Sequence, residues 1–136
     1  MKLKDAKVVL TGGARGLGAE IARALVARGA HVLISDLDSV DLSDLGVELD
    51  MPTMHCNVTD RDQVEALGRA AMEEQGKIDL WINNAGVWTP YTPVENVDFN
   101  KAHQLMEVNY FGTAYVMVEA IRHMREQNSG AILNIL

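Results

Sequence analysis

The sequence predicts an α/β fold in which helices cover both faces of a parallel sheet. Short, continuously apolar runs alternate with segments of helical period, and a glycine-rich turn follows the first run. Such alternation is typical of βαβ units. Continuous apolar runs are expected where both faces of a strand are buried. We therefore predict a doubly wound sheet of about five strands in three layers, forming one domain over residues 1–136.

The strands and the first two helices follow from this pattern. Apolar runs bounded by turn residues place the strands at Lys7–Leu10, His31–Ser35, Thr53–Cys56, Ile78–Ile82 and Ala131–Ile135. Helical spacing predicts a first helix from about Leu17 to Arg28, with Gly29 where a C-terminal cap belongs. A short acidic helix is expected over Val40–Leu45.

Two longer helices are expected in the second half of the chain. Thr59 can cap a helix over Asp60–Glu74 that Gly76 ends, and its buried face would consist of Val64, Leu67 and Ala71. The last helix should run from about Phe99 to Gln127. Its apolar stripe is expected in the core and comprises Leu105, Met106, Val116, Met117, Ala120 and Met124.

Composition and charge narrow the function classes. The 48% apolar content is that of an ordinary globular protein, and the net charge of −7 disfavours nucleic acid and anionic membranes as partners. We expect no signal peptide, because a strand follows almost directly on Met1, and no apolar stretch reaches membrane-spanning length. The single cysteine, Cys56, fits a reducing compartment, so a cytoplasmic protein is expected.

The turn Thr11–Gly18 has the chemistry of a dinucleotide site. Gly12 would allow the sharp turn, Gly16 would let the backbone approach a pyrophosphate, and Gly18 would let the helix lie close to the sheet. The N-terminus of a helix also suits a phosphate. The spacing is G-x-x-x-G-x-G, and the turn lies between a buried strand and an amphipathic helix. This context predicts a Rossmann-type cofactor site that includes Arg15 and Leu17.

Asp36 is the predicted selector between NAD and NADP. It ends the second strand, 18 residues after Gly18. A carboxylate there can accept hydrogen bonds from a ribose diol and would repel a 2′-phosphate. Leu37 follows where an arginine would favour NADP, whereas Arg15 could reach a 2′-phosphate. Because a flexible arginine can turn into water, we predict NAD; the alternative is that Asp36 only terminates the strand.

Four motifs in order resemble the short-chain dehydrogenase/reductase family and cover essentially the whole chain. They are Thr11–Gly18, Asn83–Gly86, Val108–Gly112 and the strand Gly130–Ile135. The resemblance implies an NAD-dependent oxidoreductase that transfers hydride between the nicotinamide and an alcohol or ketone carbon. It also implies a fuller fold with further strands after the fifth.

The resemblance assigns roles to further residues. Asn57 and Val58 match the stretch that holds the adenine ring, although the family usually has Asp where this chain has Asn57. The amide oxygen could still accept a hydrogen bond from the adenine amino group. Asn83, Ala85 and Gly86 match the segment along the cofactor's ribose, and Asn83 would also tie the central strands together.

Asn109 matches the family's helix asparagine. In the family this residue distorts the helix and helps to hold a water molecule in a proton relay, which makes Asn109 the one candidate catalytic residue here. Asn and Gly are both poor residues for a helix interior, so the pair Asn109 and Gly112 calls for a reason beyond propensity. The alternative is that Gly112 permits close packing and Asn109 has no role of its own.

The family's catalytic serine and Tyr-x-x-x-Lys motif have no counterpart in these 136 residues. Leu136 stands where the first serine is expected, and none of Tyr91, Tyr110 and Tyr115 has a lysine four positions later. Two functions stay open: an oxidoreductase represented by its cofactor-binding portion, or a non-catalytic NAD-binding module. The second includes a truncated or designed fragment that folds and self-associates without activity.

Metal binding is not expected, and self-association is. His55 and Cys56 are adjacent strand residues that point to opposite faces, and the other histidines lack ligand spacing. The last strand, 131–136, would be an exposed apolar edge, so we expect a homo-oligomer through that strand or through the fourth helix.

The loop Trp88–Pro93 leaves the fourth strand at the end where ligands bind in such sheets. Its aromatic side chains could contact a substrate, or the segment could be an ordinary loop.

Overall fold

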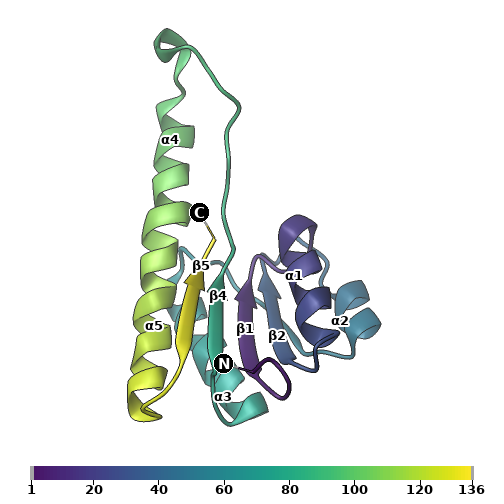
Figure 1. Ribbon diagram of the computed structural model, residues 1–136. Helices are drawn as coiled ribbons and strands as arrows, with labels where there is room; N and C mark the ends of the chain where they lie inside the picture. The colour runs from purple at the N-terminus through teal and green to yellow at the C-terminus, as the bar shows by residue number, and fades with distance from the viewer. Residues whose placement is uncertain (1, 136) are drawn as a thin grey trace.

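A computed structural model describes residues 2–135 and contains a five-stranded, entirely parallel sheet (Figure 1). The spatial order is β3-β2-β1-β4-β5, so the order reverses between β1 and β4. This is the doubly wound arrangement predicted from the sequence, and each strand lies within about two residues of its predicted bounds. The strands are β1 (Lys7–Thr11), β2 (His31–Asp36), β3 (Thr53–His55), β4 (Leu80–Asn83) and β5 (Ala131–Asn134).

Helices cover both faces of the sheet, which confirms the three predicted layers. Helices α1 and α2 pack on one face, and α3 and α5 pack on the other (Figure 1). Between β4 and β5 the chain forms a long excursion past the end of the sheet before returning along α5 (Figure 1). The helices are α1 (Gly16–Val26), α2 (Ser43–Leu49), α3 (Arg61–Gln75), η1 (Val94–Asn96), α4 (Phe99–Leu105), η2 (Met106–Gly112) and α5 (Thr113–Glu126).

Successive residues of the strands enter two separate cores. On β1, Val8 and Leu10 pack beneath α1, whereas Val9 packs beneath α3 and α5. The same alternation holds on β4, where Trp81 is fully buried on the α3 side. Both sets are apolar because neither face meets water. The predicted buried face of the third helix is confirmed, since Val64, Leu67 and Ala71 all lie in this second core.

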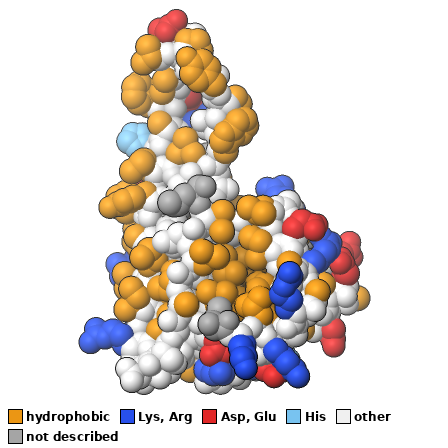
Figure 2. Space-filling view, viewed as in Figure 1, with side chains coloured by type: hydrophobic (Ala, Val, Ile, Leu, Met, Phe, Trp, Pro, Cys, Tyr) orange, Lys and Arg blue, Asp and Glu red, His pale blue; other side chains and the backbone are white. Residues whose placement is uncertain are grey.

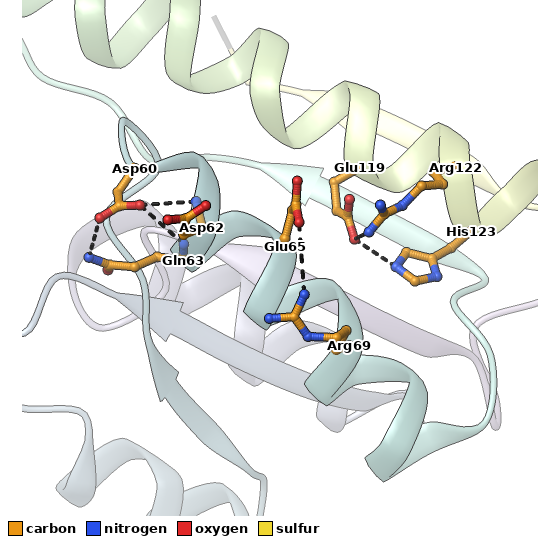
Figure 3. Close-up of polar contacts among 8 residues, drawn as sticks. All are labelled: Asp60, Asp62, Gln63, Glu65, Arg69, Glu119, Arg122 and His123. Carbon is orange, nitrogen blue, oxygen red and sulfur yellow. Dashed lines mark hydrogen bonds and ion pairs between the residues drawn. The ribbon is translucent and has the colours of Figure 1, made fainter.

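The third helix is capped by Asp60 rather than by Thr59, so that prediction is wrong. The Asp60 carboxylate accepts hydrogen bonds from the backbone N–H groups of Asp62 (3.0 Å) and Gln63 (3.2 Å) (Figure 3). Thr59 instead donates its hydroxyl to Asn57 Oδ1 at 2.9 Å. Both residue types can cap, and the tertiary course of the chain decides between them. Gly76 ends the helix in a left-handed conformation, as predicted.

The second helix lies later in the chain than predicted, over Ser43–Leu49 instead of Val40–Leu45. Val40 is held in a turn, because its N–H donates to the carbonyl of Leu37 at 3.1 Å. The helix begins after Asp41, whose carboxylate accepts both the backbone N–H and the hydroxyl of Ser43. These hydrogen bonds lower the pKa of Asp41 below its ordinary value.

The fourth predicted helix is one helical run whose middle, η2, is a π-helix. Its outer bounds match the prediction, but its apolar stripe does not stay on one face. Val116 and Ala120 are buried, whereas Met106 is exposed. A π-turn widens the helix and rotates the following face, and the stretch before it projects past the sheet (Figure 1). Helical spacing counted from α5 therefore fails across η2.

A buried carboxylate of α5 packs against α3. Glu119 is only 4% exposed, and its Oε1 accepts hydrogen bonds from Arg122 Nη2 and His123 Nε2, each at 2.8 Å (Figure 3). Gly68 on α3 leaves the space for it: a Cβ at Gly68 would collide with Glu119 Oε1 and lie 2.8 Å from His123 Nε2. Sequence patterning missed Glu119, because a glutamate on a helix is normally solvent-exposed.

Gly68→Ala should therefore destabilise the fold, although alanine favours helix. Overpacking costs about 1–3 kcal/mol, and the gain in helix propensity offsets about 1 kcal/mol of it. We expect a net loss of up to about 2 kcal/mol in the free energy of unfolding, measured by urea denaturation with circular dichroism. Glu73→Ala, at an exposed position of the same helix, is the control and should change stability little. Increased stability for Gly68→Ala would contradict this packing account.

Candidate cofactor site

A cavity of about 650 Å³ lies at the carboxyl ends of the strands, beside the point where the strand order reverses between β1 and β4. In open α/β sheets this is where ligands bind. The walls come from five segments that are far apart in the sequence. The residues that line the cavity are Gly12, Arg15, Leu17, Gly18, Asp36, Leu37, Cys56, Asn57, Val58, Thr59, Asn84, Ala85, Gly86, Val87, Gln104, Glu107 and Val108.

All the cofactor-binding residues predicted from the sequence line this cavity except Gly16 and Asn83. The cavity residues that were not predicted lie within or beside the motifs. Asn84 and Val87 flank the predicted Ala85 and Gly86, and Cys56 and Thr59 flank the pair 57–58. Gln104, Glu107 and Val108 are spaced as i, i+3 and i+4, so the helical period counted from Val108, which lies in a predicted motif, could have found the other two.

The three glycines of the first turn differ in what surrounds them. Gly12 has a φ of 63°, and a Cβ there would lie 2.6 Å from Ala85 Cα. A Cβ at Gly18 would collide with the carbonyl oxygen of Gly12 and lie 2.7 Å from Asn84 Nδ2. Gly16 also has a positive φ, of 53°, but a Cβ there would have no atom within 4 Å. Gly12 and Gly18 are thus required by the packing of the chain, whereas Gly16 borders open space.

Asn84 fixes the first turn to the end of β4. Its Nδ2 donates to the carbonyls of Gly12 (2.7 Å) and Thr11 (3.3 Å), and its backbone N–H donates to Thr11 Oγ1 at 3.2 Å. Asn83, which was predicted to contact the cofactor, is buried and faces the other way. Its Nδ2 donates to Asn134 Oδ1 at 2.8 Å, so Asn83 ties β4 to β5 and does not line the cavity.

Asp36 is a carboxylate held in place by the backbone. Its Oδ2 accepts from the N–H of Ala14 at 3.0 Å, and its Oδ1 accepts from the N–H of Leu37 at 2.8 Å. The first bond joins the end of β2 to the glycine-rich turn. Arg15, on the same turn, is exposed at the cavity wall. A hydrogen-bonded negative charge and an exposed positive one therefore line the same cavity.

Asn57 and Val58 line the part of the cavity wall that follows β3 in the chain. The Asn57 side-chain oxygen accepts from the backbone N–H (3.1 Å) and the hydroxyl (2.9 Å) of Thr59. An adenine amino group would compete with both bonds for this oxygen. Val58 is buried against the π-helix, where a Cβ at Gly112 would lie 2.7 Å from Val58 Cγ2. Gly112 therefore permits close packing, as the alternative interpretation held.

Asn109 nevertheless has a role of its own. Its Oδ1 accepts from the N–H of Val87 and its Nδ2 donates to the carbonyl of Val87, each at 2.8 Å. The side chain thus clamps both backbone groups of a residue of the cavity wall. Asn109 lies within η2, which agrees with the helix distortion that the resemblance implies. A π-helical turn at a functional site is a common arrangement.

Cys56 is a cavity residue whose thiol is protonated. Burial, and secondarily the charge of Asp60, raises its pKa to about 12. We expect its reaction with a disulfide reagent at pH 8 to be at least about tenfold slower in the folded chain than in urea, because the thiolate is the nucleophile. Absorbance of the released thiolate measures the rate. Equal rates in the folded and unfolded chain would contradict the buried environment.

The aromatic side chains of the loop Trp88–Pro93 do not join the cavity. Trp88 and Tyr91 are exposed, Tyr91 to 95%, and neither lines the cavity. Among residues 2–135, no group of three or more His, Cys, Asp or Glu side chains is placed to hold a metal ion. Within the same range, no helix is both long and apolar enough to cross a bilayer.

Comparison with known proteins agrees with this architecture. The sequence profile described as short chain dehydrogenase matches residues 6–136. The chain is 39% identical over 129 residues to an L-fucose dehydrogenase of Oryctolagus cuniculus, covering 94% of this chain and 45% of that protein. It is 38% identical over 133 residues to a cis-4-hydroxycyclohexanecarboxylate dehydrogenase of Sinomonas cyclohexanicum, covering 93% and 53%.

Solved structures give the same result. A short chain dehydrogenase from Mycobacterium smegmatis superposes with a TM-score of 0.90 at 28% identity, covering 98% of this chain and 57% of that one. A short-chain type dehydrogenase/reductase from Mycobacterium ulcerans gives 0.92 at 25% identity, covering 98% and 52%. The chain spans about half the length of the curated relatives it matches. With its glycine-rich turn, strand order and cavity, the chain belongs to the short-chain dehydrogenase/reductase family.

Proposed function

We propose that this chain is the NAD-binding portion of an oxidoreductase that exchanges hydride between a nicotinamide and an alcohol or ketone carbon. The observation that carries the proposal is the cavity at the β1–β4 reversal, walled on one side by the glycine-rich turn and on another by Asp36. The two relatives named above are dehydrogenases of a sugar and of a hydroxylated ring acid. Both names support an alcohol as the substrate class.

The residues present fit a dinucleotide. Gly16 borders open space at the start of α1, where backbone N–H groups and the helix dipole favour a phosphate. Asp36 offers carboxylate oxygens to ribose hydroxyls. Ala85 and Gly86 line the cavity next to Val87, whose backbone the Asn109 side chain holds by two hydrogen bonds. When bound, the nicotinamide supplies or accepts the hydride. The chain's own residues bind and orient the dinucleotide.

NAD is preferred over NADP in this proposal because of how Asp36 is held. Two backbone N–H groups fix the carboxylate, so it cannot swing away from a 2′-phosphate, whereas the exposed Arg15 can turn into water. A 2′-phosphate placed beside the Asp36 carboxylate would be repelled by it. An ion pair with the exposed Arg15 would offset little of that repulsion. The buried, free Cys56 is compatible with the cytoplasmic location expected from the sequence.

Within these 136 residues, we propose binding without turnover, because no tyrosine is followed by the lysine that the family's acid–base chemistry uses. The test is absorbance at 340 nm with NAD and a panel of secondary alcohols, run beside a measurement of NADH binding. We expect NADH to bind and no hydride transfer above buffer. Turnover by the chain would overturn the non-catalytic part, and absence of binding would overturn the cofactor part.

Self-association through α5 is a further part of the proposal. Val118 and Ile121 on its outer face are 65% and 43% exposed, and apolar side chains follow this edge of the molecule in Figure 2. They line a groove of about 590 Å³ together with Arg122, Arg125 and Glu126. Because both charge signs flank the apolar residues, a second copy related by a two-fold axis would be complementary.

We expect light scattering at micromolar concentration to give the mass of a dimer, and Val118→Glu with Ile121→Glu to give one chain. Leu133→Lys on the edge strand β5 tests the other surface predicted from the sequence, where Leu133 is exposed. If Leu133→Lys gave the mass of one chain and the α5 variant stayed a dimer, the interface would lie on β5 instead of α5. A single-chain mass for the unaltered protein would contradict self-association altogether.

A further inference from the structure

The end of β2 is fixed from outside the cavity by β3. Asp36 and His55 are register partners on these two strands. The backbone N–H of Cys56 donates to the carbonyl of Asp36 at 2.8 Å, and the His55 Nδ1 lies 3.0 Å from the carbonyl oxygen of Leu37. The carbonyls of Asp36, the last residue of β2, and of Leu37, which follows it, therefore contact Cys56 and His55 at the end of β3. His55 itself is exposed and does not line the cavity.

Both backbone groups of Leu37 are hydrogen-bonded, its N–H in the peptide unit before its Cα and its carbonyl in the unit after it. Its N–H donates to Asp36 Oδ1 at 2.8 Å, and its carbonyl accepts from Val40 N–H at 3.1 Å in addition to His55. The two lone pairs of that carbonyl oxygen are thus both engaged. The two contacts to the carbonyl restrain the position of the Leu37 backbone, and a displacement of that backbone would move the N–H that the Asp36 carboxylate accepts. The imidazole contact consequently constrains a side chain that it does not touch.

The contact between His55 and the Leu37 carbonyl requires a proton on the Nδ1 atom of the imidazole. A carbonyl oxygen only accepts, so His55 Nδ1 must be the donor, and both the neutral Nδ1–H tautomer and the imidazolium can donate from it. The edge strand β3 has only three residues, and burial of the imidazole does not explain its orientation, because the side chain is exposed. The hydrogen bond of this ring to the Leu37 carbonyl reaches a residue that lines the cofactor site.

We propose that His55 is a positioning residue for cofactor selection. Through Leu37, it holds the Asp36 carboxylate in the orientation that accepts the ribose hydroxyls of NAD and faces the 2′-phosphate of NADP. The inference rests on the proposed NAD-binding function. It adds to that function a residue outside the cavity, on a different strand, that contributes to the preference between the two dinucleotides.

The test compares dissociation constants for NADH and NADPH in three variants at His55. His55→Ala removes the donor. His55→Gln keeps a long polar side chain but places its amide nitrogen where Nε2 was. His55→Asn places an amide nitrogen at the position of Nδ1. His31→Ala, at an exposed histidine at the other end of β2, is the matched control.

We expect His55→Ala and His55→Gln to weaken NADH binding about five- to tenfold and NADPH binding less, so that the NADH preference falls. His55→Asn should restore both constants to within about twofold, and His31→Ala should change neither. Circular dichroism shows whether each variant is folded; if His55→Ala is not, His55→Gln against His55→Asn carries the same comparison.

The outcomes separate the inference from the function on which it rests. If the unaltered chain binds neither dinucleotide, the proposed function fails. If the unaltered chain binds NADH and the His55 variants keep both its affinity and its preference, only the positioning inference is overturned. Equal weakening of NADH and NADPH, or failure of His55→Asn to rescue, also overturns it, because a merely structural role predicts either result.

Discussion

Gly18→Ala is expected to abolish NADH binding and to lower the free energy of unfolding by about 3 kcal/mol or more. The added Cβ would overlap the carbonyl oxygen of Gly12 and lie 2.7 Å from Asn84 Nδ2. Neither neighbour is a flexible side-chain end, because one is backbone and the other is tied to Thr11 and Gly12 by hydrogen bonds. The helix would have to lift from the turn, which would open the phosphate end of the cavity. Urea denaturation and NADH titration measure the two effects.

Gly16→Ala is the matched control, because its Cβ would meet no atom within 4 Å. The φ of 53° costs an alanine roughly 1–2 kcal/mol, so the variant should fold with a moderate loss of stability. Its NADH affinity should still fall, since the methyl group would occupy the space proposed for the pyrophosphate. A folded Gly18→Ala with unchanged NADH affinity would contradict the packing role of Gly18. Undiminished affinity in Gly16→Ala would contradict the proposed phosphate position.

Asp36→Asn is expected to invert the cofactor preference. Charge-assisted hydrogen bonds to ribose hydroxyls contribute about 1.5–3 kcal/mol, so NADH affinity should fall about 10- to 100-fold. NADPH affinity should rise, because the repulsion of a 2′-phosphate is removed while Arg15 stays available. Asparagine keeps one oxygen to accept from Leu37 N–H or Ala14 N–H, so the fold should tolerate the change. Dissociation constants for both dinucleotides, at one fixed salt concentration, measure the inversion.

Asp38→Asn separates a local hydrogen bond from general charge. Asp38 is exposed two residues further along the same connection, and it does not line the cavity. Its replacement removes one negative charge but leaves both Asp36 hydrogen bonds intact, so we expect less than a twofold change in either constant. If Asp36→Asn left the NADH preference unchanged, Asp36 would only terminate β2, which is the alternative interpretation of this residue.

The sheet and most of the cavity could be predicted because they depend on strong local patterns. Continuous apolar runs such as Val8–Leu10 are required where helices cover both faces, and the strand order then follows from the connections. Gly12 and Gly18 lie where the chain itself needs small residues, so their positions were visible before the fold was known. Residues within or beside the motif Asn83–Gly86, such as Asn84 and Val87, line the cavity because they belong to the same backbone segment.

Tertiary context decided what the sequence did not reveal. Asn83 and Asn84 are identical in chemistry, and only the end of β4 determines that the first faces β5 and the second faces the glycine turn. Glu119 is buried because Gly68, fifty-one positions earlier, leaves room for it. The π-helix likewise depends on contacts across the fold, since the Asn109 side chain bonds to the backbone of Val87. Periodicity within one segment carries none of this information.

A calorimetric titration with NADH, repeated with NADPH, would show whether these 136 residues bind NAD selectively. We expect one NADH bound per chain and at least about tenfold weaker binding of NADPH, with Asp36→Asn reversing that order. Absence of heat with both dinucleotides, from a chain that circular dichroism shows to be folded, would contradict NAD binding by these residues. Equal affinity for the two would contradict the selective role of Asp36.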